Sequence, residues 1–237
     1  MGGHGMFPPF GGIGPYGAYG NLGLYRALSA FGSLSLTEAS PPQSFSEILT
    51  LVEVKSYLRL PDRSPADQAE DDELTSLIVA AREQAEILQG RDLIRKQFDL
   101  SLDYWNNYRI ELRDPLVSVD HFHYKNSTGT VTVMAENTDF IVDTARHPGF
   151  VSPPYNKTWP TFPTWPSSAI LIRFTSGYAP TSPFWSDAGA RVKNGMKLLI
   201  NNWYHNRLPF EKGMTATAEY PYAVTACLSH GSLVRAR

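Results

Sequence analysis

The sequence predicts an α+β protein: three main helices with an inserted small antiparallel β-sheet, plus extended N- and C-terminal arms. Three observations predict this class. Apolar residues recur at helical spacing before about residue 97 and again after about residue 178. Between these positions they alternate with polar residues, as in β-strands. At both ends of the chain they show no period. We divide the chain into an N-terminal extension at 1–43, a body at 44–207 with the β insertion at about 97–178, and a C-terminal arm at 208–237.

The composition limits what the chain can do. Its 237 residues carry 21 Lys and Arg against 23 Asp and Glu, a net charge of −2, which argues against binding nucleic acid through bulk charge. Cys227 is the only cysteine, which excludes an internal disulfide framework and a cysteine-based zinc cluster. No apolar run reaches the roughly 18 residues of a spanning helix, so we expect no membrane insertion.

The N-terminal extension has an unusual composition. It holds ten of the 18 glycines and only two formal charges, Arg26 and Glu38, so it cannot build a core of its own. This composition is typical of a disordered tail. The alternative, which we adopt, is that its aromatic rings dock onto neighbouring subunits or another protein. The rings are Phe7, Phe10, Tyr16 and Tyr19.

The first predicted helix covers about 51–59. Thr50 and Glu53 have the spacing of a capping box, in which each side chain accepts a hydrogen bond from the other residue's backbone N–H group. The helix is expected to end before Pro61, whose ring disfavours helical geometry in the residue that precedes it.

The second predicted helix covers about 66–89. Ser64 caps it, Pro65 fits its first position, and Gly90 supplies the stop. Acidic residues crowd its first turns, where they face solvent and interact favourably with the helix dipole. They are Asp67, Glu70, Asp71, Asp72 and Glu73.

From Gln97 the apolar period changes to two, which predicts an antiparallel sheet. Turn residues separate the runs, and the stretch at 147–166, with six prolines, is expected to be a loop. The expected strands lie at 97–104, 109–113, 117–125, 130–134, 140–142 and 169–174.

Helical spacing returns in the third predicted helix, at about 186–206. Gly195 weakens this helix by about 1 kcal/mol relative to Ala, a cost that close packing against another backbone would offset. Residues 208–237 show no clear period and are expected to form an extended arm.

Signals for catalysis stay at background level, and the chain carries no nucleophile elbow, P-loop, dinucleotide-binding turn or zinc-protease helix. We therefore expect no enzyme activity and no cofactor. Two alternatives stay open. His121 and His123 point to one face of a predicted strand, as two ligands of a metal-dependent enzyme would. The third ligand would be Asp143, His147 or another distant residue. Asp143 and His147 also have the residue types of an acid–base pair. A monomeric carbohydrate-binding module would instead use the rings of Trp159 and Trp165.

Six segments, in this order, resemble the head–tail connector (adaptor, or head-completion) proteins of tailed bacteriophages. The resemblance covers roughly 48–207 and does not extend to either end of the chain. The segments are 49–59 (LTLVEVKSYLR), 71–91 with its DDEL start, AAR centre and GR end, 115–119 (PLVSV), 140–143 (FIVD), 172–178 (IRFTSGY) and 198–204 with LL and WY at its ends.

The resemblance implies a structural virion protein without catalysis. It implies a ring of about twelve copies that binds the portal protein, meets a downstream tail or head-closure protein, and lets DNA pass without specific binding. The implied location is the head–tail junction of the virion, after assembly in the cytoplasm of the bacterial host, with no membrane partner.

Two groups of residues are the expected contact sites. The end of the last helix and the arm carry rings and cations typical of interfaces, and we expect them to bind the portal. These are Trp203, Tyr204, Arg207, Phe210, Tyr220 and Tyr222. The rings of the N-terminal extension, Phe7, Phe10, Tyr16 and Tyr19, are expected to contact neighbouring subunits or another tail component.

Overall fold

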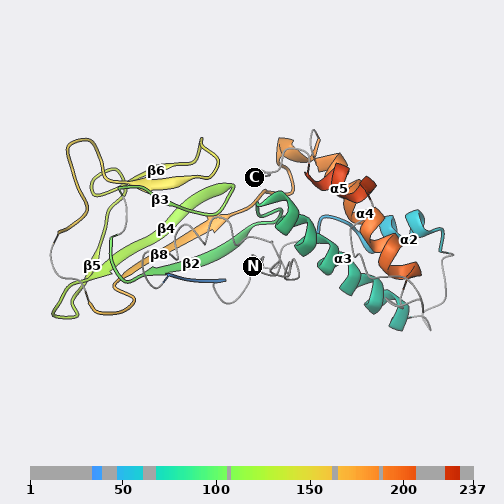
Figure 1. Cartoon of the computed structure of the whole chain (residues 1–237), viewed down its shortest axis with the longest axis horizontal. Helices are drawn as coiled ribbons and strands as arrows, with labels where there is room; N and C mark the ends of the chain where they lie inside the picture. Colours follow the sequence, from blue (N-terminus) through green and yellow to red (C-terminus); the bar gives the residue numbers. More distant parts are fainter. Residues whose placement is uncertain are drawn as a thin grey trace, which may run out of the picture.

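In a computed structural model the molecule is elongated, with its helices at one end and its sheets at the other (Figure 1). The structure describes residues 34–38, 47–60, 68–105, 108–161, 165–186, 189–206 and 222–229. The predicted α+β class is confirmed. No helix in these ranges combines the length and the apolar character needed to cross a membrane.

Within the described residues, the helical end is built from four α-helices and a 3₁₀ turn that surround one buried cluster, to which Leu74, Ile78, Met196 and Leu199 belong. The three predicted helices are confirmed close to their expected bounds. The elements are α2 (Leu51–Leu58), α3 (Gln68–Gln89), η2 (Pro183–Trp185), α4 (Gly189–His205) and α5 (Tyr222–Ser229).

The capping box is present as predicted. The backbone N–H of Glu53 donates to Thr50 Oγ1 at 3.2 Å, and the backbone N–H of Thr50 donates to Glu53 Oε2 at 3.0 Å. The hydrogen bond that the Thr50 backbone N–H donates to the Glu53 carboxylate is the largest cause that lowers the pKa of Glu53, and the Thr50 hydroxyl, which also donates to Oε2, lowers it further. The helix ends at Arg59, which adopts the left-handed conformation with φ 56°.

The β end contains two antiparallel sheets where the sequence predicted one. The five-stranded sheet has the order β1-β2-β8-β4-β5, and the three-stranded sheet has the order β3-β7-β6. A second buried cluster, which includes Phe98, Phe122, Ile172 and Phe174, forms their core. The strands are β1 (Leu34–Glu38), β2 (Lys96–Leu102), β3 (Ile110–Glu111), β4 (Leu116–Lys125), β5 (Val131–Val133), β6 (Ile141–Asp143), β7 (Phe150–Ser152) and β8 (Ile170–Ser176).

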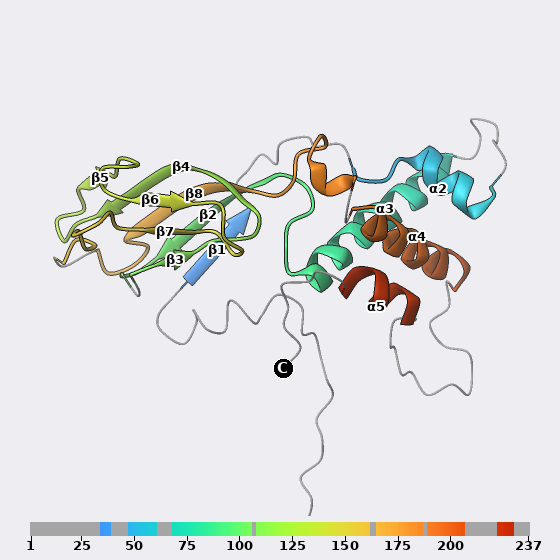
Figure 2. The same ribbon diagram turned by 90° about the horizontal axis from the view of Figure 1, so that it is seen from above.

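The structure corrects the expectation for the chain ends in two places. Residues 34–38, assigned to the N-terminal extension, form β1, which lies along β2 (Figure 2). The alternation of Leu and polar residues in this strand lets Leu36 pack against the sheet core. Within the supposedly extended arm, α5 packs on α4 and α3, with Val224 and Leu228 buried at helical spacing.

A third correction concerns the proline-rich stretch at 147–166, expected to be a loop. Its residues Phe150–Ser152 form β7, the central strand of the smaller sheet. Phe150 and Val151 are buried there, so tertiary packing overrides the local turn signals.

Candidate interaction surfaces

The last turn of α4 carries Trp203 and Tyr204, two of the residues expected to bind the portal. Both side chains are partly buried against the helical cluster. The Tyr204 hydroxyl donates to Glu70 Oε1 at 2.5 Å, which ties the end of α4 to the start of α3. The two rings therefore have fixed positions at the far tip of the helical end.

The acidic start of α3 lies at the same tip. Asp71 pairs with Lys55 of α2 at 2.5 Å while about a third of its side chain stays exposed, and Asp72 is exposed. The expectation of a solvated acidic turn is confirmed for these two residues. The tip thus combines aromatic rings with carboxylates.

The other expected contact residues lie at or beyond the limits of the described structure. Tyr222 is the first residue of α5, which packs against the helical body. Arg207, Phe210 and Tyr220 lie outside the described residues, as do Phe7, Phe10, Tyr16 and Tyr19. Their roles stay predictions.

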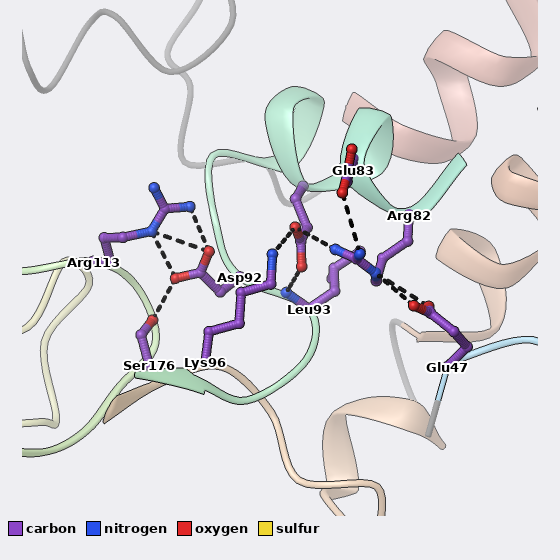
Figure 3. Close-up of polar contacts among 9 residues, drawn as sticks. Glu47, Arg82, Glu83, Asp92, Leu93, Lys96, Arg113 and Ser176 are labelled. Atoms are coloured by element: carbon purple, nitrogen blue, oxygen red, sulfur yellow. Dashed lines mark hydrogen bonds and ion pairs between the residues drawn. The ribbon is translucent and has the colours of Figure 1, made fainter. Parts of the chain in front are cut away.

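Between the helical end and the sheets lies a junction of ion pairs (Figure 3). Arg82 of α3 binds Glu86 at 2.9 Å and Glu47 at 3.1 Å. Burial alone would lower the pKa of Arg82, but the charges of Glu86 and Glu47 outweigh it and raise the pKa. Glu86 also binds Lys96 of β2 at 2.8 Å and accepts the backbone N–H of Leu93 at 3.0 Å.

A second part of the junction is centred on Asp92, whose side chain is fully buried. Its carboxylate accepts two hydrogen bonds from the Arg113 guanidinium, one of them from Nε at 2.8 Å, and one from Ser176 Oγ at 2.7 Å. Arg113 also stacks over the Phe98 ring at 4.7 Å. The segment between α3 and β2 is thereby fixed to the end of β8. Sequence analysis missed Asp92, because its partners are distant in the chain.

The face with His121 and His123 does not have the surroundings of a metal site. The Asp99–Arg173 ion pair at 2.7 Å lies on the neighbouring strands. Burial, and after it the charge of Lys125, lower the pKa of His123. Within the described ranges, no three His, Cys, Asp or Glu side chains are placed to hold an ion together. The cations on this face therefore disfavour a bound metal.

Asp143 and His147 do not form the acid–base pair considered for them. Asp143 contacts Arg146 at 3.6 Å, while His147 Nδ1 lies 2.5 Å from Oδ1 of Asp114. The Asp114 side chain is only 1% exposed and that of His147 is 53% exposed. The imidazole therefore covers a buried carboxylate beside the junction.

The two tryptophans considered for a carbohydrate platform lie in different environments. Trp159 is buried, and its ring stacks on that of Trp105 with centroids 4.8 Å apart. Trp165 lies against Gly129 and is 42% exposed. Trp159 instead helps to line an open groove of about 520 Å³, together with Tyr104, Trp105, Tyr108, Thr158, Pro160 and Thr161.

No protein-family model and no curated protein matches the chain. Solved structures do match. A chain from the neck of an empty gene transfer agent (GTA) particle, computed with C6 symmetry, is 24% identical with a TM-score of 0.63, over 86% of this chain and 97% of the other. A chain from the virion of the native GTA particle is 23% identical with a TM-score of 0.63. The match covers 85% of this chain and 97% of the other.

A chain from the neck of the native GTA particle, computed with C12 symmetry, is 21% identical with a TM-score of 0.57. The match covers 86% of this chain and 97% of the other. These similarities show that this chain shares the fold of GTA neck chains over most of its length. The resemblance to connector proteins, which the sequence segments indicated, is confirmed at the level of the fold.

Proposed function

We propose that the chain is a structural protein of a virion neck, which forms an adaptor ring between the portal and the tail of a tailed phage and extends the DNA channel. One observation carries the proposal. The likeness to GTA neck chains extends over 97% of each neighbour and includes both the helical end and the sheets. A shared fold does not by itself give a shared role, so the role needs its own test.

The ring is supported by symmetry and by shape. Two neighbours come from necks computed with C6 and C12 symmetry, and we propose a ring of about twelve copies for this chain. An elongated subunit with chemically different ends fits such a ring, because one end can face the portal and the other a downstream tail or head-closure protein (Figure 1).

We propose that the helical tip faces the portal. Trp203 and Tyr204 are held at this tip, and Arg207, Phe210, Tyr220 and Tyr222 belong to the chain that follows α4. Tyr, Trp and Arg are the residue types that most often dominate interface energies. The net charge of −2 fits a channel through which DNA passes without adhering.

The direct experiment mixes the purified full chain with portal rings and measures particle mass and images. The expected result is a ring of this chain bound to the portal. Trp203→Ala should weaken attachment at least tenfold, and Tyr155→Ala should leave it unchanged, because Tyr155 is 89% exposed at the opposite, β end.

A chain that stays monomeric and ignores the portal would overturn the proposed function. Equal attachment of the two variants would keep the ring and reject the helical tip as the portal contact. Tight DNA binding by the assembled ring at about 0.15 M salt would contradict free passage of DNA.

A further inference from the structure

The groove lined by Tyr104 and Tyr108 is not used by the proposed function. It lies at the end of the larger sheet that is remote from the helices, because β2 starts at Lys96 beside α3 and runs away from it (Figure 1). Tyr104 is 44% exposed and Tyr108 is 54% exposed. Two large aromatic side chains therefore border an open hollow.

The walls of this groove are fixed in place. The indole N–H of Trp159 donates to the backbone oxygen of Tyr108 at 3.1 Å, and the Tyr108 hydroxyl donates to the backbone oxygen of Pro153 at 3.3 Å. Trp105 stacks on Trp159, and among the described residues its buried indole N–H has no acceptor. The two stacked tryptophan rings therefore form a rigid aromatic wall of the groove.

The lining selects a class of ligand. Tyr, Trp, Pro and Thr make up the groove, without a Lys, Arg, Asp or Glu among them. Grooves lined by aromatic side chains suit extended proline-containing segments, whose prolines restrict the unbound chain. A neutral segment with prolines and aromatic rings is therefore the matching occupant.

The chain itself contains such a segment. Residues 7–19 read FPPFGGIGPYGAY, with three prolines and four aromatic rings and without any charged side chain. Leu34, where β1 begins, pairs with Leu102 at the end of β2, and Tyr104 follows two residues later. The chain before Leu34 thus joins the sheet at the same end where the groove lies.

We infer that residues 7–19 bind in the groove of their own chain, with Tyr104 and Tyr108 as its aromatic borders. The residues between Tyr19 and Leu34 span up to about 50 Å when extended, which is ample for this short path. A short covalent link between two binding elements also gives an effective concentration in the millimolar range, so even a weak contact is occupied. The inference does not depend on the portal or on ring formation.

Cross-linking in the full chain tests this inference. Unlabelled chains carry a photoreactive phenylalanine analogue at position 10. They are mixed with ¹⁵N-labelled chains that lack the analogue, so that the mass of each cross-linked peptide shows whether it joins one chain or two. We expect cross-links to 104–108 and 158–161, and we expect them within unlabelled chains only. A synthetic peptide of residues 5–20 in excess should reduce their yield at least threefold.

Tyr104→Ala combined with Tyr108→Ala should lower the yield at least fivefold, and Tyr155→Ala is the matched control that should retain it. Because both groove side chains are exposed, the double variant should fold, which its thermal unfolding verifies. Cross-links spread over the surface, or equal yields in the double variant and the control, would overturn the inference. Cross-links between labelled and unlabelled chains would assign the groove to a neighbouring copy and reject binding within one chain.

Discussion

At the scale of single residues, the buried carboxylate of Asp92 has the largest predicted effect on stability. Asp92→Ala removes the acceptor of both Arg113 and Ser176 while its surroundings stay buried. Loss of one member of a buried ion pair costs about 3–5 kcal/mol, and we expect this decrease in the free energy of unfolding by urea denaturation.

Glu83→Gln is the matched control for Asp92→Ala. Glu83 also pairs with an arginine of the junction, Arg82 at 3.4 Å, but its side chain is 60% exposed. An exposed ion pair contributes about 0–1 kcal/mol, so this variant should stay close to the parent. Equal effects of the two substitutions would show that burial does not determine the contribution of these pairs.

Asp99 gives a pH-dependent prediction. The hydrogen bond from Arg173 lowers the pKa of Asp99 below the usual value of an aspartate. A carboxylate whose pKa is lower in the folded than in the unfolded state stabilises the fold at any pH above its unfolded-state pKa. This stabilisation is lost as the pH falls through the folded-state pKa. Asp99→Asn should therefore reduce stability at pH 7 by about 0.2–1 kcal/mol, and the difference should shrink as the pH falls below the ordinary carboxyl range and Asp99 takes up a proton.

Unfolding curves of the parent and of Asp99→Asn between pH 2 and pH 7 measure this dependence. A difference that persists undiminished at pH 2 would assign the effect to packing and not to charge.

Residue-level predictions from sequence succeeded where the partners are close in the chain. Thr50 and Glu53 are three residues apart, so their pattern is readable without a fold. Asp92 and Arg113 are 21 residues apart, and Asp114 and His147 are 33 apart. Only the packed sheets bring these partners together, which is why no local pattern predicts them.

At the scale of elements, Gly195 determines how closely α5 approaches α4. A Cβ at this position would lie 2.6 Å from Cδ2 of Leu228, well inside contact distance. Gly195→Ala should therefore displace α5 and cost about 1–3 kcal/mol, although alanine favours the helix itself. Hydrogen exchange of the α5 backbone should accelerate.

Asn194→Ala is the control for this substitution, because Asn194 is exposed on the same helix. It should leave exchange in α5 unchanged. If hydrogen exchange in α5 were unchanged in both variants, the close contact at Gly195 would not be what holds α5 in place. The sequence indicated a close approach at Gly195 but attributed it to another backbone, whereas the nearest atoms belong to the Leu228 side chain.

Elements were missed where the local composition conceals them and tertiary contacts stabilise them. β1 follows a glycine-rich stretch and β7 lies in a proline-rich one, and both are stabilised by pairing with β2, β3 and β6. The eight residues of α5 are too few for a stable isolated helix. Long periodic segments such as α3, in contrast, were predicted close to their bounds.

At the scale of the whole molecule, the burial of α5 changes what a deletion of 208–237 would do. The sequence predicts an extended arm here, but Val224 and Leu228 are 1% and 0% exposed in the helical cluster. Removing large apolar side chains from a core costs about 2–5 kcal/mol each, so we expect the truncated chain to melt well below the parent. Scanning calorimetry measures this.

Phe210→Ala is the variant that separates attachment from stability. It removes one aromatic ring of the arm and leaves α5 in the chain, so we expect reduced binding to the portal, and its melting temperature is measured beside that of the truncated chain. A truncated chain with the parent's melting temperature would contradict the contribution of α5 to the core.

Two described segments connect the helical end to the β end, one at Ile94 and one at Gly177, and their close approach has a consequence for protein engineering. A Cβ on Gly177 would lie 2.0 Å from the backbone oxygen of Ile94, so the chain enters and leaves the β end at almost the same point. We expect that such an insertion can be exchanged for a shorter or longer one only if the new β end supplies the cations that Arg113 and Lys96 place on Asp92 and Glu86. β1 adds a second condition, because it joins the larger sheet from outside the insertion. A transplanted β end would therefore require two grafts, one continuous and one of five residues.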